Sequence, residues 1–269
     1  MIYFEESKDS DIPELKKIWK ICFGDPDSYI DFFFDNKFRT CKSIIMRDSG
    51  KAIGAMYLMP VSAYECGEVK NGFYGYAIGI LPEYRGQGIY SRLDKLIYEY
   101  ITKHNLFYIL CPANQKLCEY YQSLGFMENA FVSERTVCST DAKSSFTVSA
   151  LSAETYESMR NSHFDNIIYW DRSSLEYVLK ENVFLGGHNL FFEDEGFFVI
   201  ARKIGNVLKI IESNVSECKI QQITDYLCRE YKTKSAVWIL PENDTDLHLL
   251  YGLSRNLKKE NYYLNLILD

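Results

Sequence analysis

The segment PEYRGQGIYSRL at residues 82–93 places Arg85, Gly86 and Gly88 between an apolar run and an amphipathic, helix-like pattern. Because glycine has no Cβ, its backbone can adopt positive φ, and a phosphate can come within hydrogen-bonding distance of the N–H groups. A helix that begins at this point adds unpaired N–H groups and the positive end of its dipole. The segment therefore predicts a site for a phosphorylated ligand, with an ordinary surface turn as the simpler alternative.

Spacing separates this segment from two other phosphate-binding patterns. Neither G-x-x-x-x-G-K-[ST] nor G-x-G-x-x-G occurs in the chain. The R-x-x-G spacing is short enough to arise by chance, so by itself it is a weak signal. Its position after a predicted strand and before an amphipathic helix strengthens the interpretation.

The apolar patterns predict the elements that would position this segment. Residues 72–81 read as a long strand that leads into it, in which Gly75 and Gly79 indicate a bulge or a close approach to the backbone. Residues 106–112 read as a strand buried on both faces. The other elements expected in the first half are a strand at 2–6, helices at 11–23 and 29–34, a hairpin over 43–64, helices at 90–104 and 114–124, and closing strands over 126–139.

The second half repeats part of this order, which predicts two related domains at 1–138 and 146–269, joined by a polar linker at 139–145. It contains no counterpart of RGQGIY between its hairpin and its following helix, so we expect one cofactor site per chain. The elements expected there are helices near 152–161 and 170–183, a strand around 191, a hairpin over 196–213, a helix at 217–231 and a strand at 236–241.

The run IGILPEYRGQGIYSRL resembles motif A of the GCN5-related N-acetyltransferases (GNAT), whose signature is [QR]-x-x-G-x-[GA]. The spacing N-x6-Y-x3-G-F, given by Asn114, Tyr121, Gly125 and Phe126, is similar to the family's next helix. Both motifs occur in the family's order over residues 2–138. The resemblance implies an α/β (α+β) GNAT fold, with a mixed central sheet flanked by helices, and a second, degenerate GNAT-like domain.

Two details qualify this resemblance. The last [GA] position of the signature is Tyr90, so a bulky side chain must fit at the first turn of the helix. Such a residue, combined with a second related domain, is similar to the first two domains of the "enhanced intracellular survival" acetyltransferases. Those enzymes use a terminal carboxylate as a base, but they carry a third domain, so we do not transfer that role to Asp269.

The resemblance also implies how the site is used. Acetyl-CoA is the expected cosubstrate, and Tyr121 is expected to stabilise the departing thiolate, with its neighbour Tyr120 as the alternative. Asn114 is expected to cap its helix or contact the cofactor. The remaining cofactor-binding residues are Arg85, which would brace the loop; Gly86, Gln87, Gly88, Ile89, Tyr90 and Ser91, whose N–H groups would bind the pyrophosphate; and Ile78, Gly79 and Ile80, which would bind the pantetheine arm.

A general base for the attacking amine is not evident. The strand at 72–81 has no Asp or Glu, and surface solvation is the default for the nearest alternatives, Glu83, Asp25, Asp27 and Asp31. The four histidines at 104, 163, 188 and 248 have no ligand spacing, so no metal is expected. The triplet Trp170-Asp171-Arg172 either lines an acceptor cleft or begins a helix, and packing is the simpler interpretation.

Composition limits the function classes. A net charge of −7 argues against nucleic-acid binding, no apolar run is long enough to span a membrane, and eight scattered cysteines suggest reduced thiols in the cytoplasm. We therefore expect a cytoplasmic N-acetyltransferase that acts on a primary amine of a small molecule or peptide. The alternative is a non-catalytic acyl-CoA sensor with the same fold. The acceptor and the oligomeric state are not legible in the sequence.

Overall fold

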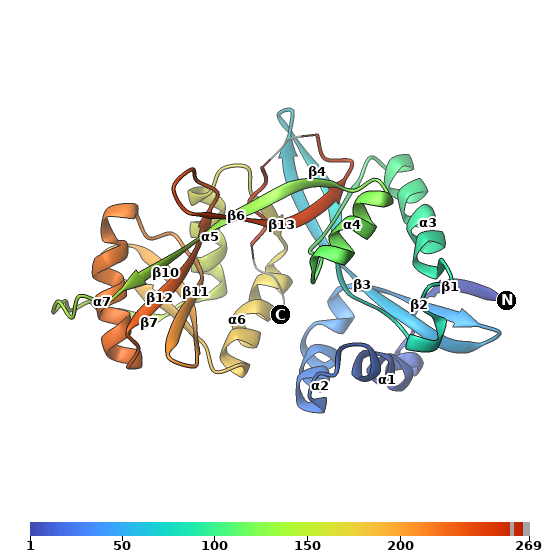
Figure 1. Ribbon diagram of the computed structural model, residues 1–269, viewed down its shortest axis with the longest axis horizontal. Coiled ribbons are helices and arrows are strands. Elements are labelled where there is room, and N and C mark those ends of the chain that lie inside the picture. Colours follow the sequence, from blue (N-terminus) through green and yellow to red (C-terminus); the bar gives the residue numbers. More distant parts are fainter. Residues whose placement is uncertain (259–260, 266–269) are drawn as a thin grey trace. The chain divides into compact units, whose positions relative to one another are not determined.

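A computed structural model describes residues 1–258 and 261–265 (Figure 1); Asp269 lies outside the described residues. Contacts divide the chain into two compact units. The first contains Met1–Glu128 and a segment that begins at Gly252, and the second contains Asn129–Tyr251 and residues 261–265. This division differs from the expected limits because most of β6 (Met127–Cys138) falls in the second unit, while the end of β13 (Leu247–Arg255) returns to the first.

The first unit is built on a mixed sheet in the order β1-β2-β3-β4-β5-β13. All neighbours in it are antiparallel except β4 and β5, which run parallel. A parallel pair requires a crossover, and the helix α3 provides it. The bounds of the first five strands are β1 Ile2–Glu6, β2 Lys42–Asp48, β3 Lys51–Glu65, β4 Glu68–Ile80 and β5 Phe107–Leu110.

Helices cover both faces of this sheet, as adjacent residues of β3 show. The ring of Tyr57 lies 5.4 Å from that of Trp19 in α1 (Ile12–Phe23), whereas Leu58 shares a cavity with Leu93 of α3 (Ile89–Lys103). Because successive side chains of a strand point to opposite faces, α1 and α3 lie on opposite sides. The remaining helices of this unit are α2 (Asp27–Asn36) and α4 (Gln115–Ser123), with short 3-10 turns at Asp9–Asp11, Phe38–Thr40 and Pro82–Tyr84.

The helix ends agree with their sequence signals. Gly24 ends α1 with φ 79°, and the Asn114 side chain accepts a hydrogen bond from the Leu117 N–H at 3.1 Å, so Asn114 is the N-cap of α4. The structure therefore confirms the capping role expected for Asn114.

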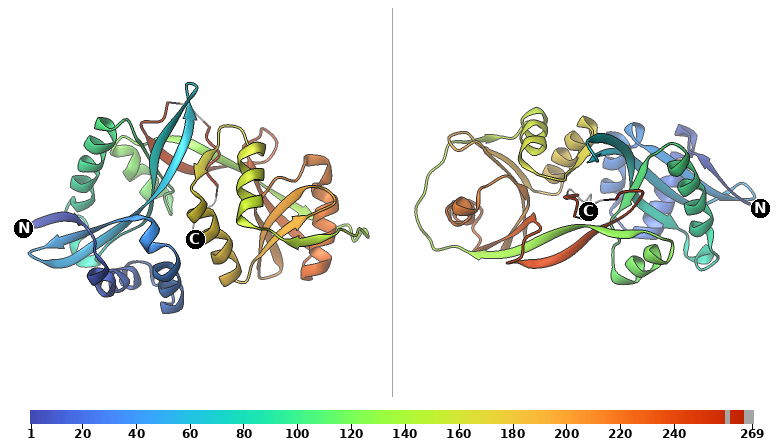
Figure 2. Two further views of the ribbon diagram at one scale, coloured as in Figure 1. Left: turned by 180° about the vertical axis from the view of Figure 1, so that it is seen from behind. Right: turned by 90° about the horizontal axis from the view of Figure 1, so that it is seen from above.

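The second unit repeats this plan with a sheet in the order β6-β12-β11-β10-β9-β7, shown from two further directions in Figure 2. Its parallel pair is β11 and β12, joined by α7, and its other neighbours are antiparallel. The connection from β11 to α7, residues 214–219, contains no glycine and so has no counterpart of the R-G-Q-G turn. Its elements are β7 Val148–Ala150, α5 Ala153–His163, β8 Ile168–Trp170, α6 Arg172–Phe184, β9 His188–Phe192, β10 Phe197–Ile204, β11 Val207–Ser213, a 3-10 turn Glu217–Lys219, α7 Ile220–Tyr231 and β12 Ser235–Pro241.

Each unit has a core of its own kind. Trp19 packs against Phe33 at 4.7 Å between ring centroids in the first unit, and Trp238 donates from its indole N–H to Thr224 Oγ1 at 3.0 Å in the second. The second core gathers buried aliphatic side chains of β10, β11, α7 and β12 around Trp238. Both units thus bury enough apolar surface to position their loops.

Candidate functional site

The turn between β4 and α3 exposes a row of backbone donors. Gly86 and Gly88 have φ of 73° and 66°, and Gly88 is the N-cap of α3. In the part of the chain described, no N–H of residues 86–91 donates to a backbone carbonyl, whereas the Arg92 N–H already bonds the Gly88 carbonyl at 3.2 Å. A Cβ added at either glycine would meet no atom within 4 Å. The turn is therefore an open cradle of N–H groups at the positive end of a helix.

Side chains of the turn hold this cradle in shape rather than fill it. Arg85 donates from Nε to the Ile80 carbonyl at 2.9 Å, and Gln87 donates from Nε2 to the Glu83 carbonyl at 3.1 Å. Arg85 thus braces the loop against the end of β4, as the resemblance implied.

The end of β4 is an open strand edge beside this turn. β4 pairs with β5 only from Gly72 to Gly75, so residues 76–80 have no β5 partner. The Leu81 N–H donates to the Ile53 carbonyl at 2.9 Å. In an antiparallel ladder, hydrogen-bonded and non-hydrogen-bonded residues alternate. The N–H and C=O of Ile80 therefore point away from β3, and those of Gly79 point toward it. The polar edge that an extended ligand arm could join therefore lies at Ile80, whereas Ile78 falls within a register shift of β4, where strand alternation does not fix its direction.

The bulge that the sequence indicated in this strand is present, but it lies at Ala77, between the two glycines. Ala77 has φ 45°, and the β3–β4 register shifts between Ala55 and Tyr57. A non-glycine residue at positive φ is unusual, and a bulge bends its strand. The two glycines that had suggested a bulge instead make room for side chains: a Cβ at Gly75 would lie 2.3 Å from the Tyr108 hydroxyl, and one at Gly79 would lie 3.1 Å from Cys22 Sγ.

Two neighbouring tyrosines of α4 point to different surroundings. Tyr121 is buried, and burial, together with Tyr120 and Asp94, raises its pKa well above the ordinary range. In the described part of the chain its hydroxyl has no hydrogen-bond partner. Tyr120 is half-buried, and its hydroxyl lies 3.0 Å from Ser91 Oγ in the first turn of α3. Tyr121 therefore stays a protonated donor, whereas Tyr120 contacts the cradle.

Tyr90, the bulky residue at the motif's last position, does not enter the cradle. Its side chain is buried behind the turn, its hydroxyl lies 3.5 Å from that of Tyr108, and its ring meets that of Tyr121 edge-on at 5.6 Å. The space for Tyr108 comes from Gly75. The departure from the family signature is thus accommodated by packing.

A buried ion pair that the sequence did not indicate lies beneath these tyrosines. Asp94 of α3 and Arg255 of β13 are 3% and 7% exposed, and Arg255 Nη2 lies 3.2 Å from Asp94 Oδ2. Burial raises the pKa of Asp94, and Arg255 opposes that shift. Since β13 reaches this unit from far along the chain, no spacing rule could have paired the two residues.

The carboxylates considered as bases are engaged in contacts of their own. Asp25 accepts from the Trp19 indole at 2.7 Å, and Asp27 and Asp31 pair with Lys20 and Lys16 at 2.9 and 2.7 Å. Glu83 lies 3.7 Å from Lys51. These contacts favour the interpretation of all four carboxylates as surface groups.

The remaining residues considered as site candidates belong to structural contacts or stay untested. Asp171 caps α6 by accepting from the Ser174 N–H at 2.9 Å, and the Trp170 indole donates to the Leu264 carbonyl at 3.4 Å. The side chain of His248 lies outside the described part of the chain. Within residues 1–258 and 261–265, no group of His, Cys, Asp and Glu could hold a metal ion, and no helix is long and apolar enough to cross a membrane.

Comparison with known families decides the class of the first unit. Residues 4–128 match the family model described as an acetyltransferase (GNAT) domain. The first unit is a GNAT acetyltransferase domain. The GNAT family uses acetyl-CoA as its acyl donor. The cradle, the open β4 edge and the adjacent Tyr121 all lie within the matched residues. No curated protein matched the sequence.

Solved structures extend the likeness over both units. A conserved protein of Enterococcus faecalis aligns with TM-score 0.76 and 15% identity, covering 95% of this chain and 72% of the other. Eis1 of Mycobacterium abscessus gives 0.68 and 10%, with coverage of 95% and 73%. A tandem GNAT protein from the clavulanic acid biosynthesis pathway gives 0.57 and 9%, with coverage of 95% and 98%. The chain therefore has a tandem GNAT fold.

Proposed function

We propose that the chain is an acetyl-CoA-dependent N-acetyltransferase that acetylates a primary amine of a small molecule or peptide. The observation that carries the proposal is the open row of N–H donors at residues 86–91. It lies at the start of a long helix and beside an unpaired strand edge. A diphosphate fits the donors, and an amide-containing arm fits the edge.

Different residues of the first unit are proposed to bind the pyrophosphate and the pantetheine arm. Gly86, Gln87, Gly88, Ile89, Tyr90 and Ser91 supply N–H groups to the pyrophosphate, and Arg85 braces the loop. Ile78 and Ile80 offer the strand edge to the pantetheine arm, with Gly79 between them allowing α1 to approach. Acetyl-CoA supplies an activated acyl group when it is bound.

Tyr121 is proposed as the donor to the departing sulfur. A thiol has a pKa near 8.5 and a phenol near 10, so full proton transfer in water costs about 2 kcal/mol. Burial raises the pKa of Tyr121 further. Stabilisation of the developing thiolate by a hydrogen bond is therefore favoured over complete proton transfer.

The amine must lose its proton, and the four carboxylates considered as bases, all of them described residues, are held in other contacts. An amine with pKa near 10.4 is less than about 0.1% neutral at pH 7. The carboxylates nearest the expected acceptor region form contacts of their own. We propose that water removes the proton, so kcat/KM should rise about tenfold per pH unit from pH 7 to 9. A plateau near neutral pH would instead indicate a base in the protein.

Release of free thiol from acetyl-CoA, measured with a panel of amines, tests this function. The panel includes an amino sugar, a polyamine, a free amino acid and a lysine peptide, with each amine omitted in turn as the blank. Amine-dependent thiol release supports the enzyme. Calorimetric binding of acetyl-CoA without thiol release for any amine would favour the acyl-CoA sensor, and the absence of binding would refute both. A cytoplasmic location stays a prediction.

A further inference from the structure

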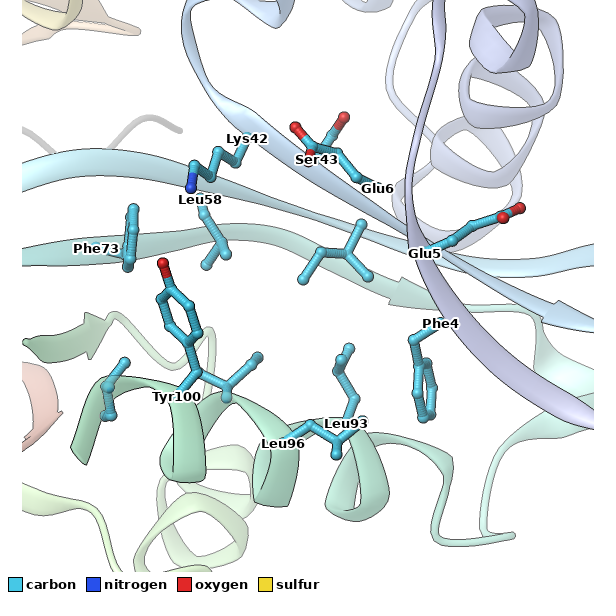
Figure 3. Close-up of a pocket in the computed structure, with 13 residues that line it drawn as sticks. Phe4, Glu5, Glu6, Lys42, Ser43, Leu58, Phe73, Leu93, Leu96 and Tyr100 are labelled. Carbon is cyan, nitrogen blue, oxygen red and sulfur yellow. The ribbon is translucent and has the colours of Figure 1, made fainter. Parts of the chain in front are cut away.

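An apolar cavity lies between α3 and the sheet of the first unit, on the face opposite α1 (Figure 3). Its volume is about 320 Å³, at the lower end of the roughly 300–1,000 Å³ that ligand pockets occupy. Four strands supply the floor and α3 the roof. The main lining side chains are Phe4, Ile44, Leu58, Phe73, Leu93 and Ile97.

The mouth of the cavity exposes apolar side chains to water. Leu96 and Tyr100 of α3 are 51% and 46% exposed, although both line the cavity. When a ligand covers exposed apolar groups beside a preformed cavity, the removal of their surface from water favours binding. The walls therefore suit a hydrocarbon chain.

The polar groups of the cavity are arranged unevenly. Figure 3 shows the Lys42 ammonium and the Tyr100 hydroxyl at the same end, next to Leu58 and Phe73, with Phe4 at the other end. The Lys42 ammonium lies 5.6 Å from the centroid of the Phe73 ring. Among residues 1–258 and 261–265, Lys42 forms no ion pair and the Tyr100 hydroxyl no hydrogen bond. One end of the cavity thus offers a cation without an ion-pair partner and a hydroxyl without a hydrogen-bond partner among the described residues.

The two carboxylates near the cavity do not cancel this charge. Glu5 is paired with Arg47, whose Nε lies 2.7 Å from Glu5 Oε1. The carboxylate of Glu6 points away from the space that the apolar side chains enclose, as does that of Glu5 (Figure 3). Within the described residues no carboxylate forms an ion pair with Lys42, so its ammonium is available to a negatively charged head group.

We propose that this cavity binds a medium-chain carboxylate, such as a free fatty acid. The carboxylate would accept hydrogen bonds from Lys42 and Tyr100, and the chain would run toward Phe4. The site is separate from the proposed acetyl-CoA cradle and does not depend on the proposed function. Because Leu93 and Ile97 belong to α3, whose first turn forms the cradle, a bound chain would contact the same helix from its inner face.

Isothermal titration calorimetry with octanoate, decanoate and dodecanoate tests the proposal on the full chain. Affinity should rise about fourfold for each added methylene until the cavity is full. Decanoate should bind more tightly than decan-1-ol, and decan-1-ol more tightly than decylamine. Equal or tighter binding of decylamine would overturn the head-group assignment. The absence of saturable decanoate binding would overturn the site. A dimer that forms as the protein concentration rises, and that decanoate does not dissociate, would also overturn it, because a second copy would then cover the exposed side chains at the mouth.

Two substitutions locate the binding. Lys42→Glu should weaken decanoate about 10- to 100-fold, because it removes a charged hydrogen bond and adds repulsion. Lys95→Glu makes the same charge change at an exposed position of α3 that does not line the cavity, and it should change affinity less than twofold. Ile44→Trp fills part of the cavity, so the affinity should stop rising at a shorter fatty-acid chain length than in the wild type. Equal effects of Lys42→Glu and Lys95→Glu would refute the proposed contact.

Discussion

Arg255 and Asp94 form an ion pair at 3.2 Å inside the first unit, although one belongs to β13 and the other to α3. The guanidinium also stacks on Phe126 and Tyr98, at 4.7 and 4.8 Å from their ring centroids. β13 pairs with β5 beside this contact, with Arg255 opposite Tyr108. The core of the N-terminal unit is therefore completed by C-terminal sequence.

Breaking this pair should destabilise the first unit. Asp94→Ala leaves a cation that is 7% exposed without its partner, at a cost of about 3–5 kcal/mol in the free energy of unfolding. Arg255→Met should be costly as well, and the double variant should lose less than the sum. A double-mutant cycle in urea measures the coupling, and the exposed pair Lys16–Asp31 serves as the control, with an expected coupling of about 0.2–1 kcal/mol. Additivity within about 0.5 kcal/mol at the buried pair would contradict this expectation.

Gly88→Asp should abolish acetyl-CoA binding while the protein stays folded. The new side chain meets no atom within 4 Å, so the structural cost is confined to the positive φ, about 1 kcal/mol. Its carboxylate would repel the pyrophosphate and would neutralise part of the positive potential at the start of α3 that attracts the ligand. Gly67→Asp is a matched control, since Gly67 also has positive φ and open surroundings at a hairpin turn. Calorimetry should show binding for this control only, and unchanged affinity for Gly88→Asp would remove the cradle from the mechanism.

Tyr121→Phe should lower kcat about 10²-fold with little change in KM, because it removes a donor to the leaving group but not a binding contact. Tyr120→Phe should remove only the contact with Ser91 and change kcat slightly. Because the pKa of Tyr121 is raised, no alkaline loss of activity from its ionisation should be seen up to pH 10. Should Tyr120→Phe be the variant that loses kcat, the roles of the two tyrosines are reversed.

Ala77 lies at the bulge of β4, and its substitution should separate the effect of side-chain size from that of backbone strain. Ala77→Gly relieves the positive φ but makes the unfolded chain more flexible, so stability should change by less than about 1 kcal/mol. Ala77→Val places a β-branched residue at φ 45° and should cost about 1–3 kcal/mol and weaken acetyl-CoA binding. Thermal unfolding and calorimetry measure both effects, with Ala150→Val at an exposed strand position as the control. Normal cofactor affinity in Ala77→Val would show that the bulge is dispensable.

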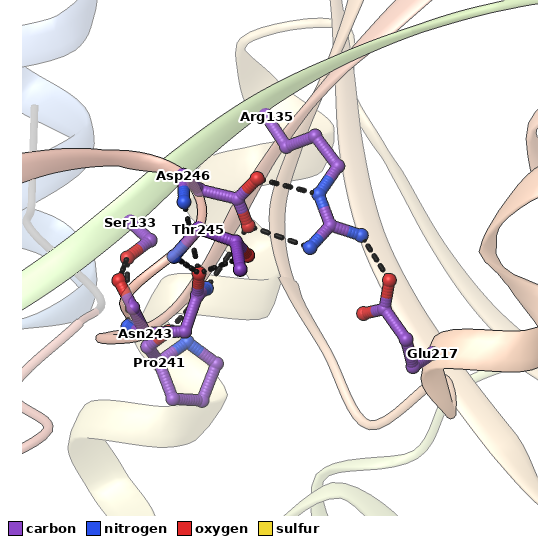
Figure 4. Close-up of polar contacts among 7 residues, drawn as sticks. All are labelled: Ser133, Arg135, Glu217, Pro241, Asn243, Thr245 and Asp246. Carbon is purple, nitrogen blue, oxygen red and sulfur yellow. Dashed lines mark hydrogen bonds and ion pairs between the residues drawn. The ribbon is translucent and has the colours of Figure 1, made fainter.

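A polar network of the second unit should give a pH-dependent stability (Figure 4). Arg135 donates to both oxygens of Asp246, at 2.7 and 2.6 Å, and holds the pKa of Asp246 below its ordinary value. A lowered folded-state pKa stabilises the protein above the unfolded value near 3.9, and this contribution is lost as the pH falls through the folded-state value. Asp246→Asn should cost about 1.5–3 kcal/mol at pH 7. The difference from the wild type should shrink below about pH 4.

The neighbouring residue Asp244 provides the control for this experiment. It lies exposed in the same loop, so Asp244→Asn should leave stability unchanged at both pH values. Urea unfolding at pH 7 and pH 3.5 measures both variants. A difference between Asp246→Asn and the wild type that stays constant with pH would show that the charge of Asp246 is not what stabilises the loop.

The sequence determined the features that depend on nearby residues. The R-G-x-G segment between a strand and an amphipathic helix predicted the cradle because helix starts, glycine conformations and caps are local properties. The same holds for the N-cap at Asn114 and for the strands that follow α3 and α7. The two-unit order was also readable, because each repeat carries its own apolar pattern.

Only the tertiary structure decided which distant residues meet. The burial of Tyr90 behind the cradle depends on Tyr108, which depends in turn on the missing side chain of Gly75. The return of β13 to β5 brings Arg255 to Asp94, and the pairing of β3 with β4 places the bulge at Ala77. Packing and strand register join residues that are far apart in the chain, so no local pattern encodes them.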